Sequence, residues 1–95
     1  MIVAVLDTGV DYNHNDIRPN LWWNPGEVYN GYDDDGNGIV DDLNGVNYSA
    51  SPPNGNFMDD GWHGTHCAGT IAAVANNGWG IAGIAGYAYG KVCIN

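Results

Sequence analysis

The sequence predicts an α/β fold built on a parallel sheet. Three observations lead to this prediction: an apolar, β-branched run at residues 2–6, a helical pattern at 64–75, and two more apolar runs at 81–85 and 91–94. A short, continuous apolar run is typical of a strand buried on both faces, as in parallel sheets. Strands on either side of a helix in the chain order favour a parallel arrangement. With 95 residues, the chain makes at most one small domain.

The first strand stops at the sequence DTG, which begins with Asp7. Functional groups of α/β folds gather at the carboxyl ends of such strands, so Asp7 is a candidate functional carboxylate. The chain from 11 to 62 is rich in turn-forming residues and is predicted to be mostly loop, with 46–48 as a candidate short strand. A loop of this length usually serves a function or binds ions.

The charge of the chain is strongly unbalanced. Eleven acidic residues stand against Arg18 and Lys91, which gives a formal net charge of −9. This balance argues against nucleic acid and anionic membrane surfaces as partners and suits a protein that takes up cations. No apolar run is long enough to span a membrane. Five aspartates fall within residues 33–42, where we expect a bound cation or local disorder.

The acidic stretch DDDGNGIVDD, residues 33–42, has the spacing of a calcium-binding loop. Calcium prefers many oxygen ligands on a flexible loop with a sharp turn. Positions one, three, five, six and seven of such a loop are occupied in order by Asp33, Asp35, Asn37, Gly38 and Ile39. Position twelve is Asn44, so Asp42, Asp41 or Glu27 must supply the closing carboxylate. We predict calcium here, with a solvated acidic turn as the alternative.

The stretch GWHGTHCAGTIAA, residues 61–73, admits three interpretations. His63 and Cys67 have helical spacing and could share a zinc ion, but the further ligand cluster of the usual zinc signatures is absent. His63 could instead be a catalytic base with Asp7 as the carboxylate that orients it. The third interpretation is a helix-capping histidine beside an ordinary turn aspartate, which composition alone favours.

The longer strings VAVLDTGVDYNHND and HGTHCAGTIAA resemble two motifs of the subtilisin-like serine protease family. The resemblance implies that Asp7 is the orienting carboxylate and His63 the general base of an Asp/His/Ser triad, in the family's chain order. It implies that His66 is non-catalytic and packed inside. It also implies a second calcium site formed by Asp16 and Asn77, with backbone carbonyls near Val74, Trp79 and Ile81.

The family's serine motif has no counterpart here, since Ser49 and Ser51 are the only serines. We therefore expect residues 1–95 to be the N-terminal part of a partial subtilisin-like domain that is inactive alone. The resemblance implies a serine endopeptidase with protein or peptide substrates and a secreted or otherwise extracytoplasmic full-length parent, and it leaves a pro-segment open. The rival interpretation is a non-enzymatic calcium-binding module or truncated relic. Cys67 is expected to be a buried free thiol, with a bridge to Cys93 as the alternative.

Overall fold

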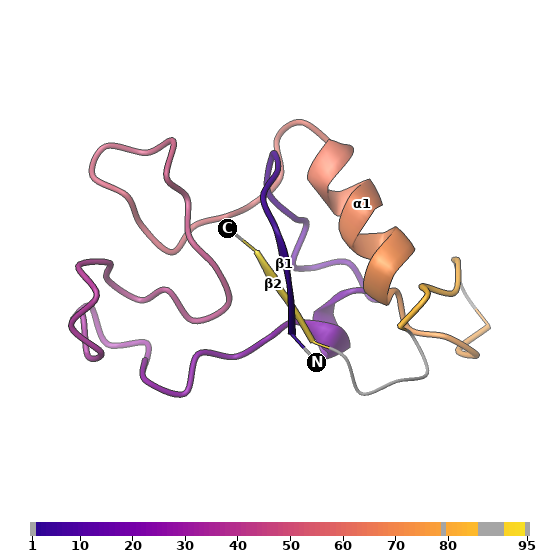
Figure 1. Ribbon diagram of the computed structural model, residues 1–95, viewed down its shortest axis with the longest axis horizontal. Helices are drawn as coiled ribbons and strands as arrows, with labels where there is room; N and C mark the ends of the chain where they lie inside the picture. The colour runs from indigo at the N-terminus through magenta and orange to yellow at the C-terminus, as the bar shows by residue number, and fades with distance from the viewer. Residues whose placement is uncertain (1, 79, 86–90, 95) are drawn as a thin grey trace.

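A parallel pair of strands with one helix packed beside it forms the regular part of the molecule (Figure 1). The computed structural model describes residues 2–78, 80–85 and 91–94, the last four by backbone only. Strand β1 (Ile2–Val5) pairs with strand β2 (Lys91–Ile94). Helix α1 (His63–Ala72) contacts both strands. The strands predicted at 2–6 and 91–94 and their parallel pairing are thus present, the first one residue shorter.

The core lies between α1 and the segment that follows β1. Its buried apolar residues are Val5, Val10, Ile17, Phe57, Ala68 and Ala72. The helix approaches this segment closely because it presents small residues there. A Cβ atom added at Gly64 would lie 2.0 Å from the carbonyl oxygen of Gly9, so only glycine allows this approach. The close contact brings the first turn of α1 next to the end of β1.

The apolar run at 81–85 is not a strand, and that prediction was wrong. The N–H groups of residues 83–85 donate instead to three carbonyl oxygens near the C-terminal end of α1, those of Ala73, Thr70 and Ile71, at 3.1, 3.0 and 2.7 Å. The last carbonyls of a helix have no partner within it and must find one elsewhere. The segment therefore caps the helix rather than extending the sheet.

The helix also begins and ends earlier than the predicted range 64–75. It begins at His63, and the chain becomes extended at Ala73, with φ −57° and ψ 138°. The next residue, Val74, donates its N–H to the carbonyl of Asp16 at 2.7 Å. This long-range bond competes with a further helical turn and explains the early end.

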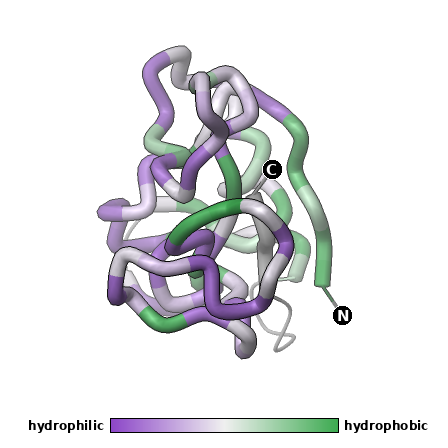
Figure 2. The backbone as a smooth tube through the Cα atoms, turned by 90° about the vertical axis from the view of Figure 1, so that its left-hand side faces the viewer, coloured by the Kyte–Doolittle hydropathy of each residue, from purple (hydrophilic) through white to green (hydrophobic). Residues whose placement is uncertain are grey.

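The long central loops lie on the side of the sheet away from α1 (Figure 1). Between β1 and α1 the only helix or strand described is the 3₁₀ helix η1 (Arg18–Asn20), so the loop prediction for 11–62 is confirmed apart from this turn. The strand suggested at 46–48 is reduced to one bridge between Asn47 and Asn54. Figure 2, viewed from this side, shows mostly hydrophilic chain. No helix within the described ranges is long and apolar enough to cross a membrane.

Candidate active site

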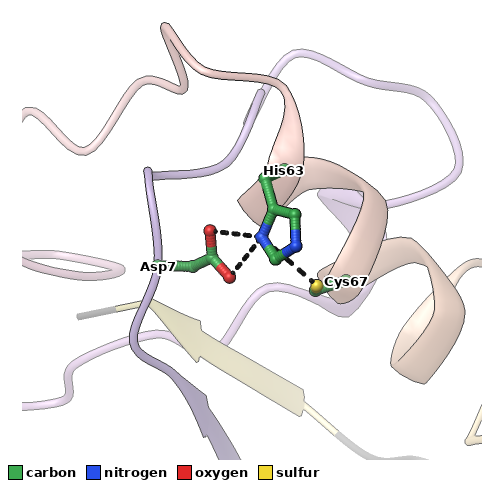
Figure 3. Close-up of side chains that lie close together, drawn as sticks. All are labelled: Asp7, His63 and Cys67. Atoms are coloured by element: carbon green, nitrogen blue, oxygen red, sulfur yellow. Dashed lines mark hydrogen bonds and ion pairs between the residues drawn. The ribbon is translucent and has the colours of Figure 1, made fainter.

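The two candidate catalytic residues lie in direct contact although 56 positions separate them in the sequence (Figure 3). Asp7 follows the end of β1, and His63 is the first residue of α1. Nδ1 of His63 lies 2.8 Å from Oδ1 and 2.7 Å from Oδ2 of Asp7. The close approach of Gly64 to Gly9 places the two elements so that the side chains meet.

The chemistry of this contact determines where the imidazole carries its proton. An ionised carboxylate only accepts hydrogen bonds, so Nδ1 of His63 must be the donor. In the neutral ring, Nε2 then carries the lone pair. No residue in the described ranges hydrogen-bonds Nε2, and the His63 side chain is 71% exposed. The arrangement can therefore accept a proton at Nε2 and stabilise the resulting imidazolium through Asp7.

Asp7 is held in its ionised form by its partners. The hydrogen bond from His63, followed by that from the N–H of Thr8, keeps the pKa of Asp7 below its usual value. Both bonds stabilise the charged carboxylate more than the neutral acid. Asp7 therefore remains an acceptor throughout the neutral pH range.

Asp59, a residue that the sequence analysis did not single out, joins the two elements. Its carboxylate accepts five hydrogen bonds of 2.5–2.9 Å, from the Thr8 hydroxyl, the Gly61 and Trp62 N–H groups, and the N–H and hydroxyl of Thr65. Three of these donors are backbone N–H groups in or just before the first turn of α1, where N–H groups lack partners within the helix. An aspartate just before a helix is a known capping signal and could have revealed this role.

The charge and backbone geometry around Asp59 both depend on these bonds. Burial alone would raise its pKa, but the hydrogen bonds from Thr65, Thr8 and Gly61 outweigh burial and hold the pKa far below its usual range. Trp62 adopts a left-handed backbone conformation with φ 69°, which costs a non-glycine residue about 1–2 kcal/mol. The bond from its N–H to Asp59 helps to offset this strain.

The neighbouring helical residues differ from expectation in two respects. His66 is exposed, so the expectation that it packs inside was wrong. Cys67 is a free thiol, as expected, but it is half-buried rather than buried, and its Sγ lies 3.7 Å from Nδ1 of His63. The alternative, a bridge to Cys93, involves a side chain that lies outside the described residues. Beside Asp7, a cleft of about 580 Å³ is lined by Leu6, Phe57 and Asp60 among others.

In the acidic loop, three carboxylates come together within 4.8 Å: those of Glu27, Asp35 and Asp42. Of these, Glu27 and Asp42 are buried. Asp35 and Asp42 come from the predicted set, and Glu27 is one of the alternatives named for the closing ligand. The Asn37 side chain lies between two of them, with Nδ2 at 3.2 Å from Asp35 Oδ2 and 3.0 Å from Asp42 Oδ2.

The other residues predicted as calcium ligands in this loop lie outside the three-carboxylate group. The Asp33 carboxylate accepts hydrogen bonds from the N–H groups of residues 36–38 and is not part of the three-carboxylate group. The Asp41 carboxylate accepts from the N–H groups of residues 30 and 31. Ile39 is buried, and its N–H donates to the Asn37 side chain at 2.8 Å. No carboxylate of the three-membered group forms an ion pair with an arginine or lysine of the described part of the chain.

The two side chains of the second predicted calcium site also lie together. Nδ2 of Asn77 donates to Oδ1 of Asp16 at 2.6 Å, and Asp16 is only 3% exposed. Among the carbonyls expected to join them, that of Trp79 falls outside the described residues.

Comparison with known proteins finds a family model, described as the subtilase family, that matches residues 1–90. Subtilisin-like protease 1 of Plasmodium vivax is 46% identical over 93 residues, which cover 96% of this chain. Thermitase of Thermoactinomyces vulgaris is 42% identical over 87% of the chain. Proprotein convertase subtilisin/kexin type 6 of Rattus norvegicus is 38% identical over 90% of it.

These relatives are much longer than the matched region. The aligned residues make up 14% of the Plasmodium vivax protein, 22% of thermitase and 8% of the convertase. The chain thus spans a small part of the length of each relative.

Proposed function

This chain belongs to the subtilase family, and from that premise we propose that it carries the aspartate and the histidine of a serine endopeptidase active site. The observation that supports the proposal most strongly is the paired contact of His63 Nδ1 with both carboxylate oxygens of Asp7, at 2.7 and 2.8 Å. Family membership alone does not assign a role to either residue. The contact supports the assignment, because the carboxylate that orients a general base must bond its imidazole.

In the proposed reaction, Asp7 orients the imidazole and His63 transfers the proton. Nε2 of His63 takes the proton of a serine hydroxyl as that oxygen attacks the substrate carbonyl. The imidazolium formed is stabilised by the adjacent Asp7 carboxylate. His63 then gives the proton to the leaving amine, which completes acylation. Deacylation by water repeats the same transfers.

We propose that the nucleophile is not among these 95 residues, which form the N-terminal part of the catalytic domain. The Ser49 hydroxyl donates to Asn47 at 2.6 Å, and neither serine of the chain lies in a motif like that of the family. Without a nucleophile the acyl chemistry does not proceed. The isolated residues are therefore expected to hydrolyse no peptide. The rival interpretation, a non-enzymatic calcium-binding module, finds no support in the comparisons.

We further propose that calcium binds the acidic loop through Glu27, Asp35 and Asp42, with oxygens of Asn37 and Ile39 as additional ligands. Buried carboxylates are normally paired with a cation or bound to a metal, and Glu27 and Asp42 have no cationic partner in the described ranges. Calcium accepts six to eight oxygens from a flexible loop, which fits this donor set. Its contribution would be to neutralise the loop and reduce its conformational freedom.

Asp16 and Asn77 are proposed as ligands of a second calcium ion. The buried carboxylate and the neighbouring amide oxygen are suitable ligands, and family membership supports the choice. Both calcium proposals are tested by calorimetric titration of the folded protein. Absence of heat up to millimolar calcium would contradict them.

The endopeptidase proposal is tested with the full-length gene product that contains these residues. His63→Ala is expected to lower kcat for a peptide substrate by about 10⁴-fold or more, because the base is lost. His66→Ala, three residues further along the same helix, is the matched control and should lie within about tenfold of the unmodified enzyme. Equal activity of the His63→Ala variant and the unmodified enzyme would refute the proposal.

A further inference from the structure

The loop that follows Val46 contains a triplet that the proposed reaction does not use. Asn47, Tyr48 and Ser49 form the pattern Asn-X-Ser, in which an oligosaccharide can be attached to the asparagine. No other serine or threonine of the chain follows an asparagine at this spacing, and the residue after Ser49 is Ala50 rather than a proline. The sequence therefore contains this pattern once.

The triplet lies at the start of an exposed loop. A bridge between Asn47 and Asn54 closes the base of this loop, with two backbone N–H···O bonds of 2.7 and 3.3 Å. Residues 48, 49 and 51–53 are exposed between these two, and the loop extends away from α1 (Figure 1). An attached oligosaccharide is bulky and hydrated, so a protein accommodates it only at a surface position of this kind.

The side-chain amide of Asn47 is held in one orientation. Its Oδ1 accepts hydrogen bonds from the N–H groups of Ser49 and Ala50, at 3.0 and 3.2 Å, and from the Ser49 hydroxyl at 2.6 Å. Because backbone N–H groups only donate, the atom that faces them is the amide oxygen. Nδ2 makes no hydrogen bond with a described residue. Since no buried side-chain nitrogen of the described residues lacks a partner, Nδ2 is open to solvent.

We propose that Asn47 is an acceptor site for an N-linked oligosaccharide, supplied by a lipid-linked pyrophosphoryl oligosaccharide and its transferase. In the transfer, Nδ2 bonds to the anomeric carbon of the first sugar and loses one proton. The bond from that carbon to the pyrophosphate breaks, and the pyrophosphate leaves with its lipid, so nothing is oxidised or reduced. The three hydrogen bonds at Oδ1 favour this step, because they stabilise negative charge on the oxygen as Nδ2 gives up its proton.

The position of Asn47 gives the oligosaccharide a consequence for the cleft beside Asp7. Asn47, Tyr48 and Ser49 line this cleft together with Asp7. An oligosaccharide on the solvent-exposed Nδ2 therefore lies at the rim and narrows the approach to the catalytic pair. A folded protein substrate is hindered more than a short peptide, because it is wider than the remaining opening. This consequence rests on the proposed endopeptidase function, whereas the modification itself does not.

The modification is tested on the full-length gene product, made with a secretion signal in a eukaryotic host. Peptide:N-glycosidase in water labelled with heavy oxygen converts a glycosylated asparagine to a labelled aspartate, which mass spectrometry locates. The label is expected at Asn47 in the unmodified protein, in Ser49→Thr and in the matched control Ser51→Ala, and is expected to be lost in Ser49→Ala. A sample without the glycosidase corrects for spontaneous deamidation of Asn44 and Asn54, which both precede a glycine.

Secreted and cell-retained protein are both digested, because the oligosaccharide is attached before export, so a variant that folds poorly still gives a result. Absence of the label at Asn47 of the unmodified protein would overturn the proposal, as would a label that persists in Ser49→Ala. A label at Asn47 in a gene product that hydrolyses no peptide would support the modification and contradict only the proposed function.

The effect on the cleft is measured separately, as kcat/KM before and after glycosidase treatment. The treatment should raise kcat/KM for a folded protein substrate several-fold and leave kcat/KM for a short peptide unchanged. Asn47→Asp is the matched control, because the glycosidase leaves an aspartate at this position, and its kcat/KM should not respond to the enzyme. Equal kcat/KM for the folded substrate before and after treatment would contradict the role of the oligosaccharide at the cleft.

Discussion

The dyad region (residues 5–17 and 57–72) and the acidic loop (residues 24–42) organise their polar groups in opposite ways. In the dyad region, key hydrogen bonds join residues 51–56 positions apart, such as Thr8 with Asp59 and Asp7 with His63. In the acidic loop, carboxylates accept hydrogen bonds from described residues at most 18 positions away. The first region is held by tertiary packing, and the second by local turns.

The difference lies in how negative charge is compensated. Asp7 and Asp59 receive hydrogen bonds from an imidazole, hydroxyls and the first turn of α1. Glu27 and Asp42 are buried beside a third carboxylate, and from the described residues they receive only amide N–H bonds. We therefore expect the dyad region to form without a metal and the acidic loop to depend on one.

The largest effect on stability is expected from Gly64→Ala, which would push α1 away from the segment that follows β1. The added Cβ would lie 2.0 Å from the Gly9 carbonyl, and backbone on both sides leaves no side chain to move aside. We expect a loss of about 3 kcal/mol in the free energy of unfolding. The measurement is urea unfolding of the purified chain.

Gly36→Ala in the acidic loop is the matched control. It has φ +75°, and no atom of the described residues lies within 4 Å of an added Cβ, so the cost is backbone strain alone, about 1 kcal/mol. Equal losses of stability for the two variants would contradict the view that tertiary packing holds the dyad region whereas local turns hold the acidic loop.

The second prediction concerns Asp59→Ala, which removes the acceptor of five hydrogen bonds. We expect a loss of about 2 kcal/mol in the free energy of unfolding. The loss is limited to this size because water can hydrogen-bond the donors that Asp59 leaves. Asp60→Ala is the control, since the exposed Asp60 makes no hydrogen bond with any residue in the described ranges. Thermal unfolding of both variants measures the difference, and a more severe effect for Asp60→Ala would contradict the role of Asp59.

Glu27→Gln tests the difference in metal dependence between the two regions. Glu27→Gln should weaken calcium binding by about tenfold or more, which corresponds to about 1.4 kcal/mol, because the closing carboxylate loses its charge. Asp34→Asn is the control. The Asp34 carboxylate accepts a hydrogen bond from the Asn30 side chain and lies outside the three-carboxylate group. Calorimetry compares the two affinities. Equal affinities would mean that Glu27 is not a ligand.

The two regions also differ in what the sequence could reveal. Asp7 and His63 lie in motifs long enough to indicate the family, and the strand ranges 2–6 and 91–94 follow from apolar runs. Asp59 was missed because its bond to Thr8, 51 positions away, depends on how the chain folds. The run 81–85 was misassigned because an apolar pattern does not show that its N–H groups cap a helix. Glu27 could be named only as one of three alternatives, since its burial depends on how the loop folds.

The smallest effect on stability is expected from a change of pH that protonates Asp7. The pKa of Asp7 is lowered from 3.8, so its contribution to stability is present above that value and is lost as pH falls through the folded-state pKa. Asp7→Asn should be less stable than the unmodified chain at neutral pH, with a difference that shrinks below about pH 4. Denaturant unfolding at several pH values gives this difference. A difference that grows on acidification would contradict the assigned pKa direction.

Whether Asp7 and His63 act as one unit can be measured by a double-mutant cycle in the full-length gene product. The measurement is kcat for a peptide substrate in the unmodified enzyme, in Asp7→Asn, in His63→Ala and in the double variant. We predict a loss of about 10⁴-fold or more for each single variant and no greater loss for the double variant than for the worse single one. An Asp7→Asn variant within tenfold of the unmodified enzyme, or losses that multiply, would show that the two residues do not act as one unit.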